Sequence, residues 1–201
     1  MDDQLDARDL VTQHLESAAS ALHRLLRNDV TLARIASAAT LMAECIQHGG
    51  TIYTCGNGGS MCDAMHLAEE LSGRYRDDRR PYPALAISDV GHITCTANDF
   101  GYASVFSRFI EGHGRSGDLL VALSTSGASP NILAAAETAR AQDMTVIALT
   151  GRADSALGAS STIEVCVDAG PHSDRAQELH IKVIHAMIGI IERTLGDASA
   201  P

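Results

Sequence analysis

The sequence predicts an α/β fold with a five-stranded parallel sheet in a three-layer, doubly wound arrangement, and extra helices at the N-terminus. From residue 51 onwards, short apolar runs alternate with segments of helical periodicity. The apolar runs are continuous, which is typical of parallel strands that helices cover on both faces. Strands and helices that alternate along a chain form doubly wound sheets, and right-handed crossovers restrict their topology.

Two amphipathic helices precede the alternating region. Apolar residues recur at helical spacing in residues 4–27 and again in residues 32–46, and Gly49-Gly50 ends the second helix. The first helix lies outside the α/β unit, so it packs either on its own domain or on a second subunit. We expect a single domain over residues 1–201, in which a helical extension (1–48) used in oligomerisation precedes an α/β core (51–195).

The remaining elements follow in order. Strands are expected at residues 51–55, 84–88, 118–124, 145–150 and 163–167, and helices at 60–73, 89–98, 102–113, 129–142 and 174–195. In doubly wound sheets the ligand lies beyond the carboxyl ends of the strands. The loops that matter for function are therefore 56–60, 88–99, 124–131 and 151–154.

Composition excludes several classes of function. Hydrophobic residues make up 45% of the 201 residues, enough for one sizeable core, and the formal net charge of −10 argues against nucleic acid or an anionic membrane as partner. A Schiff-base mechanism would have to use Lys182, the only lysine, and no Walker-type GKS or GKT occurs.

The five irregularly spaced cysteines, without a CxxC, indicate reduced thiols. No apolar stretch reaches the ~18 residues of a membrane span. We expect a soluble cytoplasmic protein.

The run CGNGGSMCDAMHLAEEL (residues 55–71) is the most informative segment. Residues 56–60, here called the glycine loop, join a strand to a helix start, where free N–H groups can hold an anion. His66 and Glu70 share one face of that helix and could ligate a metal, or Glu70 could act as a base. A tight turn and a solvated surface pair are the alternative interpretations, and Glu69 is expected on the surface.

A second polar loop, LSTSGASPN (residues 123–131), is here called the serine loop. It supplies four hydroxyl groups after a predicted central strand, and Ser129 can cap the next helix, with Pro130 in its first position. Hydroxyls and free N–H groups at a helix start can hold phosphate without a lysine. A polar loop with ordinary capping is the alternative.

The last predicted helix carries further polar residues. Asp174 and Gln177 resemble a capping box. His185 lies mid-helix in the most apolar stretch, where it is either a core histidine or, with Gln177 eight residues earlier, part of one deep pocket. His180 is expected on the surface. Asn98-Asp99 forms a further polar pair at the end of a helical segment.

Together these segments resemble the sugar isomerase (SIS) domain family. The matching segments are CGNGGSMCDAMHLAEELSGRYR, AISDVGHITCTANDFGYASVFSRF, LSTSGASPNIL and DRAQELHIKVIHAMI, from residue 55 to 188. The combination GNGGS…DAMH…EE with QE…H…H is similar to the subgroup that isomerises sedoheptulose 7-phosphate. The resemblance implies a flavodoxin-like sheet and a homotetramer with active sites at subunit interfaces.

The resemblance also implies roles for individual residues. The implied contacts to the sugar phosphate are Asn57, Gly58, Gly59, Ser60, Glu70, Asn98, Asp99, Ser124, Thr125, Ser126, Ser129 and Gln177. The implied zinc ligands are His66, Glu70, Gln177 and His185, and Arg74 and Asp174 match positions near the substrate.

The expected reaction moves a proton from C1 to C2 of a ketose through an enediol, with Glu70 as base and His185 as acid. A zinc ion would polarise the carbonyl and the hydroxyl. The product, D-glycero-D-manno-heptose 7-phosphate, would feed lipopolysaccharide, capsule or natural-product synthesis. The alternatives are a non-catalytic SIS adaptor that binds the replication initiator, and an isomerase of another sugar phosphate.

Overall fold

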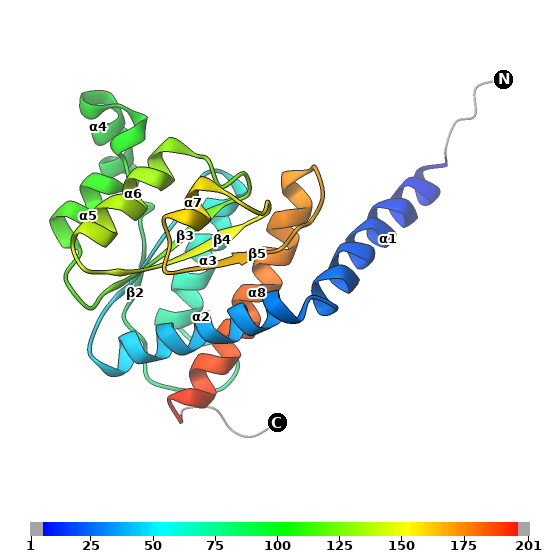
Figure 1. The fold of residues 1–201 in the computed structure, drawn as a ribbon, viewed down its shortest axis with the longest axis horizontal. Helices are drawn as coiled ribbons and strands as arrows, with labels where there is room; N and C mark the ends of the chain where they lie inside the picture. The colour runs from blue at the N-terminus through cyan, green and yellow to red at the C-terminus, as the bar shows by residue number, and fades with distance from the viewer. Residues whose placement is uncertain (1–5, 197–201) are drawn as a thin grey trace.

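The computed structural model describes residues 6–196 and contains a five-stranded sheet (Figure 1). The strands are β1 (Ile52–Cys55), β2 (Ala84–Ala86), β3 (Leu119–Ser124), β4 (Thr145–Thr150) and β5 (Ile163–Cys166). All pairs are parallel and the order is β2-β1-β3-β4-β5. The predicted parallel, doubly wound sheet is confirmed, and the reversal of strand order between β1 and β3 is the place where such sheets bind ligands.

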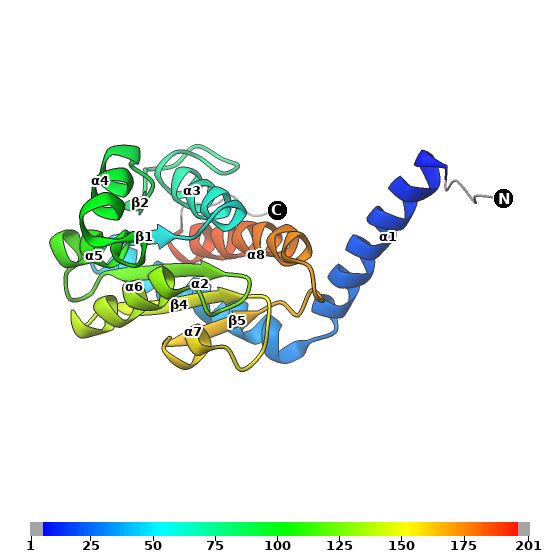
Figure 2. The ribbon, with the colours of Figure 1, turned by 90° about the horizontal axis from the view of Figure 1, so that it is seen from above.

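Helices cover both faces of the sheet. They are α1 (Ala7–Leu26), α2 (Asp29–Gln47), α3 (Gly59–Ser72), α4 (Val90–Phe100), α5 (Ser107–His113), α6 (Pro130–Ala141), α7 (Ala156–Ala159) and α8 (Ser173–Thr194), with a 3₁₀ turn η1 (Tyr102–Ser104). On β3, Leu119, Val121 and Leu123 point into a core shared with α2, α3 and α8. The alternate residues Leu120 and Ala122 point into a second core shared with α5, α6 and α7. Figure 2 shows α3 and α8 on one face and α6 on the other.

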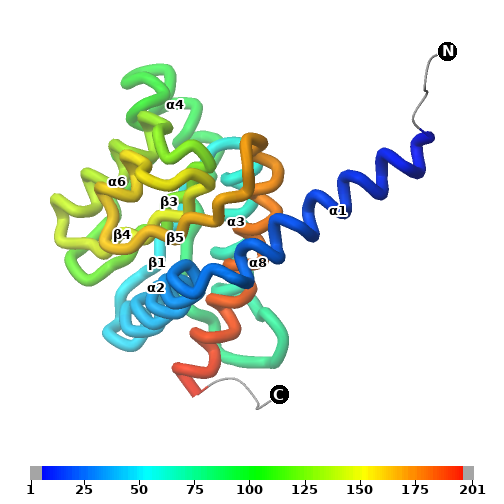
Figure 3. Tube along the Cα trace, turned by 45° about the vertical axis from the view of Figure 1, so that its right-hand side comes forward, coloured from blue at the N-terminus to red at the C-terminus, as the bar shows by residue number. Residues whose placement is uncertain are grey.

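Residues 4 and 5, which the periodicity included in the first helix, lie outside the described residues. Within those residues, α1 extends away from the rest of the molecule (Figures 1 and 3). It buries only Ala21 and Leu25, near its C-terminal end. Asn28 caps α2, because its Oδ1 accepts a hydrogen bond of 3.0 Å from the amide of Thr31. Among the described residues, no helix has the length and apolar character needed to cross a membrane.

Five local predictions need correction. The predicted helix 102–113 is a 3₁₀ turn, η1, followed by the short helix α5. The segment 156–159, for which no element was predicted, is a further short helix, α7, with too few residues for a periodicity. Ser129 occupies the N-cap position of α6, but its hydroxyl lies 3.1 Å from that of Ser124 and does not cap the helix. The capping box at Asp174 and Gln177 is absent, because α8 begins at Ser173 with His172 as its N-cap residue and no side-chain cap. His180 is not on the surface: it is 0% exposed.

Candidate active site

The glycine loop begins the site at the end of β1. Gly58, the N-cap residue of α3, has φ +55° and ψ −122°, a conformation that residues with a Cβ rarely adopt. A Cβ on Gly59 would lie 2.5 Å from Oε1 of Gln177, so α8 and the start of α3 meet closely here. Ser60, in the first turn of α3, is buried. The glycines therefore allow a side chain from the last helix to lie against the loop.

The serine loop begins at the end of β3, the strand next to β1. The Oγ of Ser124 lies 3.1 Å from that of Ser129 and 3.5 Å from that of Ser126. The amide of Gly127 donates to Ser124 Oγ at 3.1 Å, while the carbonyl of Thr125 accepts from Gly151 in the neighbouring loop. Three hydroxyls that converge at a helix start can hold phosphate oxygens, so the phosphate site at this loop stays a prediction.

Asn131 and Tyr102, which the sequence analysis missed, contact the expected site residue Asn57. Asn57 and Asn131 exchange amide hydrogen bonds of 2.9 and 2.8 Å, and Tyr102 donates its hydroxyl proton to Asn57 Oδ1 at 2.9 Å. Asn131 is 2% exposed and lies in the first turn of α6. Its place directly after Ser129-Pro130, at the expected start of a helix, was the sequence signal that could have identified Asn131. The pair fixes the glycine loop against the serine loop.

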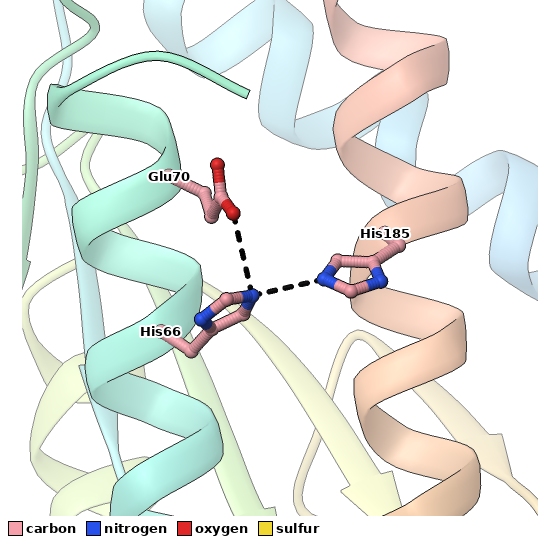
Figure 4. A group of neighbouring side chains, drawn as sticks. All are labelled: His66, Glu70 and His185. Carbon is pink, nitrogen blue, oxygen red and sulfur yellow. Dashed lines mark hydrogen bonds and ion pairs between the residues drawn. The ribbon is translucent and has the colours of Figure 1, made fainter. Parts of the chain in front are cut away.

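His66, Glu70 and His185 converge at the contact between α3 and α8 (Figure 4). His66 Nε2 lies 2.9 Å from His185 Nε2 and 3.5 Å from Glu70 Oε1. His66 and Glu70 share a face because they are four residues apart on α3, while His185 reaches across from α8. The Glu70 side chain is 16% exposed, so it is shielded without being sealed from solvent. The interpretations of His185 as a core histidine and of His66 and Glu70 as an isolated surface pair are both wrong.

The electrostatics of this cluster make the protonated ring of His185 a stronger acid. Burial lowers the pKa of His185 below its ordinary value, and the neighbouring His66 adds to this effect while Glu70 opposes it. Asp63, one turn before His66, has its pKa raised to about 6 by burial. Its Oδ2 is buried and has no hydrogen-bond partner among the described residues. Asp63 is a further polar residue near the site that the sequence analysis did not single out.

The same cluster fits a metal ion. Ligand atoms of His66, Glu70 and His185 lie within 4.8 Å of one another. Two imidazole nitrogens and a carboxylate are a donor set that zinc accepts in proteins. Gln177, the fourth expected ligand, lies on the same helix as His185, with its amide against Gly59.

The other expected site residues lie apart from this cluster. Asn98 and Asp99 are exposed on α4, where Asn98 donates to Asp99 at 2.7 Å. Tyr102, three residues after Asp99, is the residue of this segment that reaches the glycine loop, through its hydrogen bond to Asn57. Arg74 is exposed and pairs with Asp78, and Asp174 is exposed in the first turn of α8. Glu69 is exposed, as predicted, although its Oε1 lies 3.3 Å from His66 Nδ1.

Comparison with known proteins shows the family to which the chain belongs. The model of the SIS domain family matches residues 13–151. The phosphoheptose isomerase of Klebsiella pneumoniae is 50% identical over 188 residues, which cover 94% of this chain and 97% of the relative. That of Yersinia enterocolitica is 51% identical over 187 residues, covering 93% and 97%.

Solved structures give the same result. The phosphoheptose isomerase of Neisseria gonorrhoeae superposes with a TM-score of 0.86 at 35% identity, and that of Francisella tularensis with 0.88 at 33%. Each match covers 94% of this chain and all of the solved chain. The chain therefore belongs to the SIS domain family. Within that family its relatives place it among the phosphoheptose isomerases, which are aldose–ketose isomerases of heptose biosynthesis.

Proposed function

We propose that this chain converts sedoheptulose 7-phosphate into D-glycero-D-manno-heptose 7-phosphate. One observation carries the proposal: a carboxylate (Glu70) and an imidazole (His185) converge at one point between α8 and α3, the helix that begins at the glycine loop. The names of the relatives, phosphoheptose isomerase, support the substrate class.

In the proposed reaction, Glu70 removes a proton from C1 of the ketose while His185 donates a proton to the carbonyl oxygen on C2. An enediol results, with a double bond between C1 and C2. Glu70 then returns its proton to C2, and His185 takes the proton from the C1 hydroxyl as the aldehyde forms. Both side chains end in their starting states. A shielded carboxylate suits the carbon proton and an imidazole suits the oxygens near neutral pH.

The rest of the proposed site binds and orients the substrate. We assign the phosphate to the hydroxyls of Ser124, Ser126 and Ser129 and the amides around them. The proposed contacts along the sugar phosphate are Asn57, Gly58, Gly59, Ser60, Glu70, Asn98, Asp99, Thr125 and Gln177. The convergence of loops after β1 and β3 supports this assignment.

Turnover of sedoheptulose 7-phosphate by Glu70→Gln and His185→Gln tests the acid–base pair. Each substitution keeps a similar shape but removes proton transfer, so we expect kcat to fall by roughly 10²–10⁴-fold. Glu111→Gln and His48→Gln, which change exposed residues on α5 and at the end of α2, serve as matched controls. Full activity in either site variant would refute its assigned role. Wild-type turnover of a different sugar phosphate in preference would redirect the substrate assignment.

We propose that zinc binds His66, Glu70, Gln177 and His185. The triad of converging ligand atoms supports this proposal. When bound, the ion would supply Lewis-acid polarisation of the substrate oxygens, and the second oxygen of Glu70 and the second ring nitrogen of His185 would remain for proton transfer.

Metal analysis of purified protein tests the zinc site independently of activity. We expect about one zinc per chain, and its loss in His66→Gln but not in His48→Gln, because three of four ligands hold zinc far more weakly than four. A metal content that His66→Gln leaves unchanged would count against the site.

We further propose that residues 1–48 serve assembly into a homotetramer with active sites at subunit interfaces. The exposed apolar side chains of α1, and the exposure of Asn98 and Asp99 on α4, support this proposal.

A further inference from the structure

His180 is a buried titratable side chain that no step of the proposed reaction uses. It lies on α8 between Gln177 and His185, and its Nε2 is 3.2 Å from the carbonyl oxygen of Thr150, the last residue of β4. A carbonyl only accepts hydrogen bonds, so Nε2 carries the proton and donates. Nδ1 has no partner within residues 6–196. Among the described residues, the ring therefore makes one hydrogen bond, to the end of β4.

The Thr150–Gly151 peptide connects this histidine to the serine loop. The Gly151 amide donates to the carbonyl of Thr125 at 3.1 Å. A Cβ on Gly151 would lie 2.9 Å from the Cβ of Ala176 and 2.9 Å from the Thr125 oxygen. Helix α8 and the serine loop thus both lie close to Gly151 where a side chain would be, and a larger residue would displace one of them.

The same helix carries the proposed acid. His180 and His185 are five residues apart, which is about 7.5 Å along a rigid helix axis. Helix α8 is therefore linked to the serine loop through His180, Thr150 and Gly151, and it carries His185 five residues after His180. A sugar phosphate has a set length between its phosphate and C1. A change of ~1 Å in the distance between the serine loop and His185 can therefore cost on the order of 100-fold in rate.

We propose that His180 is a positioning residue, which through Thr150 and Gly151 sets the distance between the phosphate held on the serine loop and the acid–base pair. The kinetic part of this inference rests on the proposed function. The structural part, that His180 restrains the serine loop, does not.

Hydrogen exchange tests the structural part. His180→Leu keeps the volume and removes the donor, while His180→Gln keeps an N–H donor. We expect the Gly151 amide and residues 124–129 to exchange on the order of tenfold faster in His180→Leu, and His180→Gln to restore most of the protection. The control is Ile191→Ala, a buried position further along α8 that destabilises the core without touching these loops. Equal acceleration in the control and in His180→Leu would overturn the inference.

Kinetics with sedoheptulose 7-phosphate test the positioning role. We expect His180→Leu to lower kcat on the order of tenfold or more, while the inhibition constant of inorganic phosphate stays within about twofold of wild type. His180→Gln should recover most of kcat, and Ile191→Ala should leave it within about twofold. Unchanged kcat, or a phosphate affinity that falls in step with kcat, would overturn the role.

If His180→Leu does not fold, Gly151→Ala should give the same pattern. An inactive wild type counts against the proposed function, and the exchange experiment then decides the inference.

Discussion

At neutral pH the ring of His180 is uncharged, because a charged imidazole would be buried without a counter-ion. Burial lowers its pKa from the ordinary value to about 4, and the hydrogen bond to Thr150 only partly opposes this. In the unfolded chain the same ring titrates near its ordinary pKa of ~6.5. Between these two values the unfolded state binds a proton that the folded state does not, so acid favours unfolding.

Stability should therefore fall with pH in a definite window. As pH decreases from about 6.5 to about 4, His180 alone should reduce the free energy of unfolding by about 3 kcal/mol, and it should contribute no further loss below its folded pKa. Urea denaturation of wild type and His180→Gln at pH 7, 5.5 and 4 measures the difference, in which the other titrating groups cancel. Parallel curves for the two proteins across this range would show that His180 does not titrate this way.

At the scale of elements, the convergence of His66 and His185 depends on how α3 sits against α8, and Arg79 fixes that contact. Its Nε donates to Glu192 on α8 at 2.7 Å, and its other nitrogens donate to the carbonyls of Glu70 and Leu71 at the end of α3. The two side chains are 1% and 6% exposed. Arg79 thus satisfies helix-end carbonyls that would otherwise be buried without donors.

Removing this arginine should be costly. Arg79→Met leaves Glu192 buried without its partner, so we expect the free energy of unfolding to fall by about 3–5 kcal/mol. The double variant Arg79→Met/Glu192→Leu should recover part of the loss, because no unpaired charge remains. Denaturant titration of both variants measures the two values. An exposed pair, Arg74 and Asp78, provides the control, since Arg74→Met should cost under ~1 kcal/mol. A loss for Arg79→Met as small as that of the control would contradict this account.

Elements with strong periodicity were predictable from the sequence, and features set by contacts distant in sequence were not. All five strands lie within the predicted ranges, because continuous apolar runs between helices leave little alternative. The position of His180 could not be read from its polar neighbours, since the end of β4 decides which face of α8 is buried. The hydroxyl of Ser129 is engaged by Ser124 from the preceding strand, which outweighs its local tendency to cap α6. Asn131 was missed because its partner, Asn57, lies in another loop.

At the scale of the whole molecule, α1 is hard to explain in a single chain. It projects from the body (Figure 1) with Val11 58% and Leu15 67% exposed on one face. A helix of this length has little stability in water unless its apolar face packs against something. A second copy of the chain is the occupant that the proposed tetramer provides.

The double variant Val11→Glu/Leu15→Glu tests that assembly. Carboxylates on this face would have to be desolvated in an interface, so we expect the tetramer to dissociate to dimers or monomers while the α/β core remains folded. Light scattering after size exclusion measures the mass, and circular dichroism measures the fold. Ser20→Lys, an exposed position on the opposite side of α1, is the matched control and should remain tetrameric.

If α1 brings active sites together, the dissociated variant should also lose turnover of sedoheptulose 7-phosphate. A double variant that keeps the wild-type mass would show that this face of α1 is not the interface, and one that dissociates yet keeps full turnover would show that each chain holds a complete site.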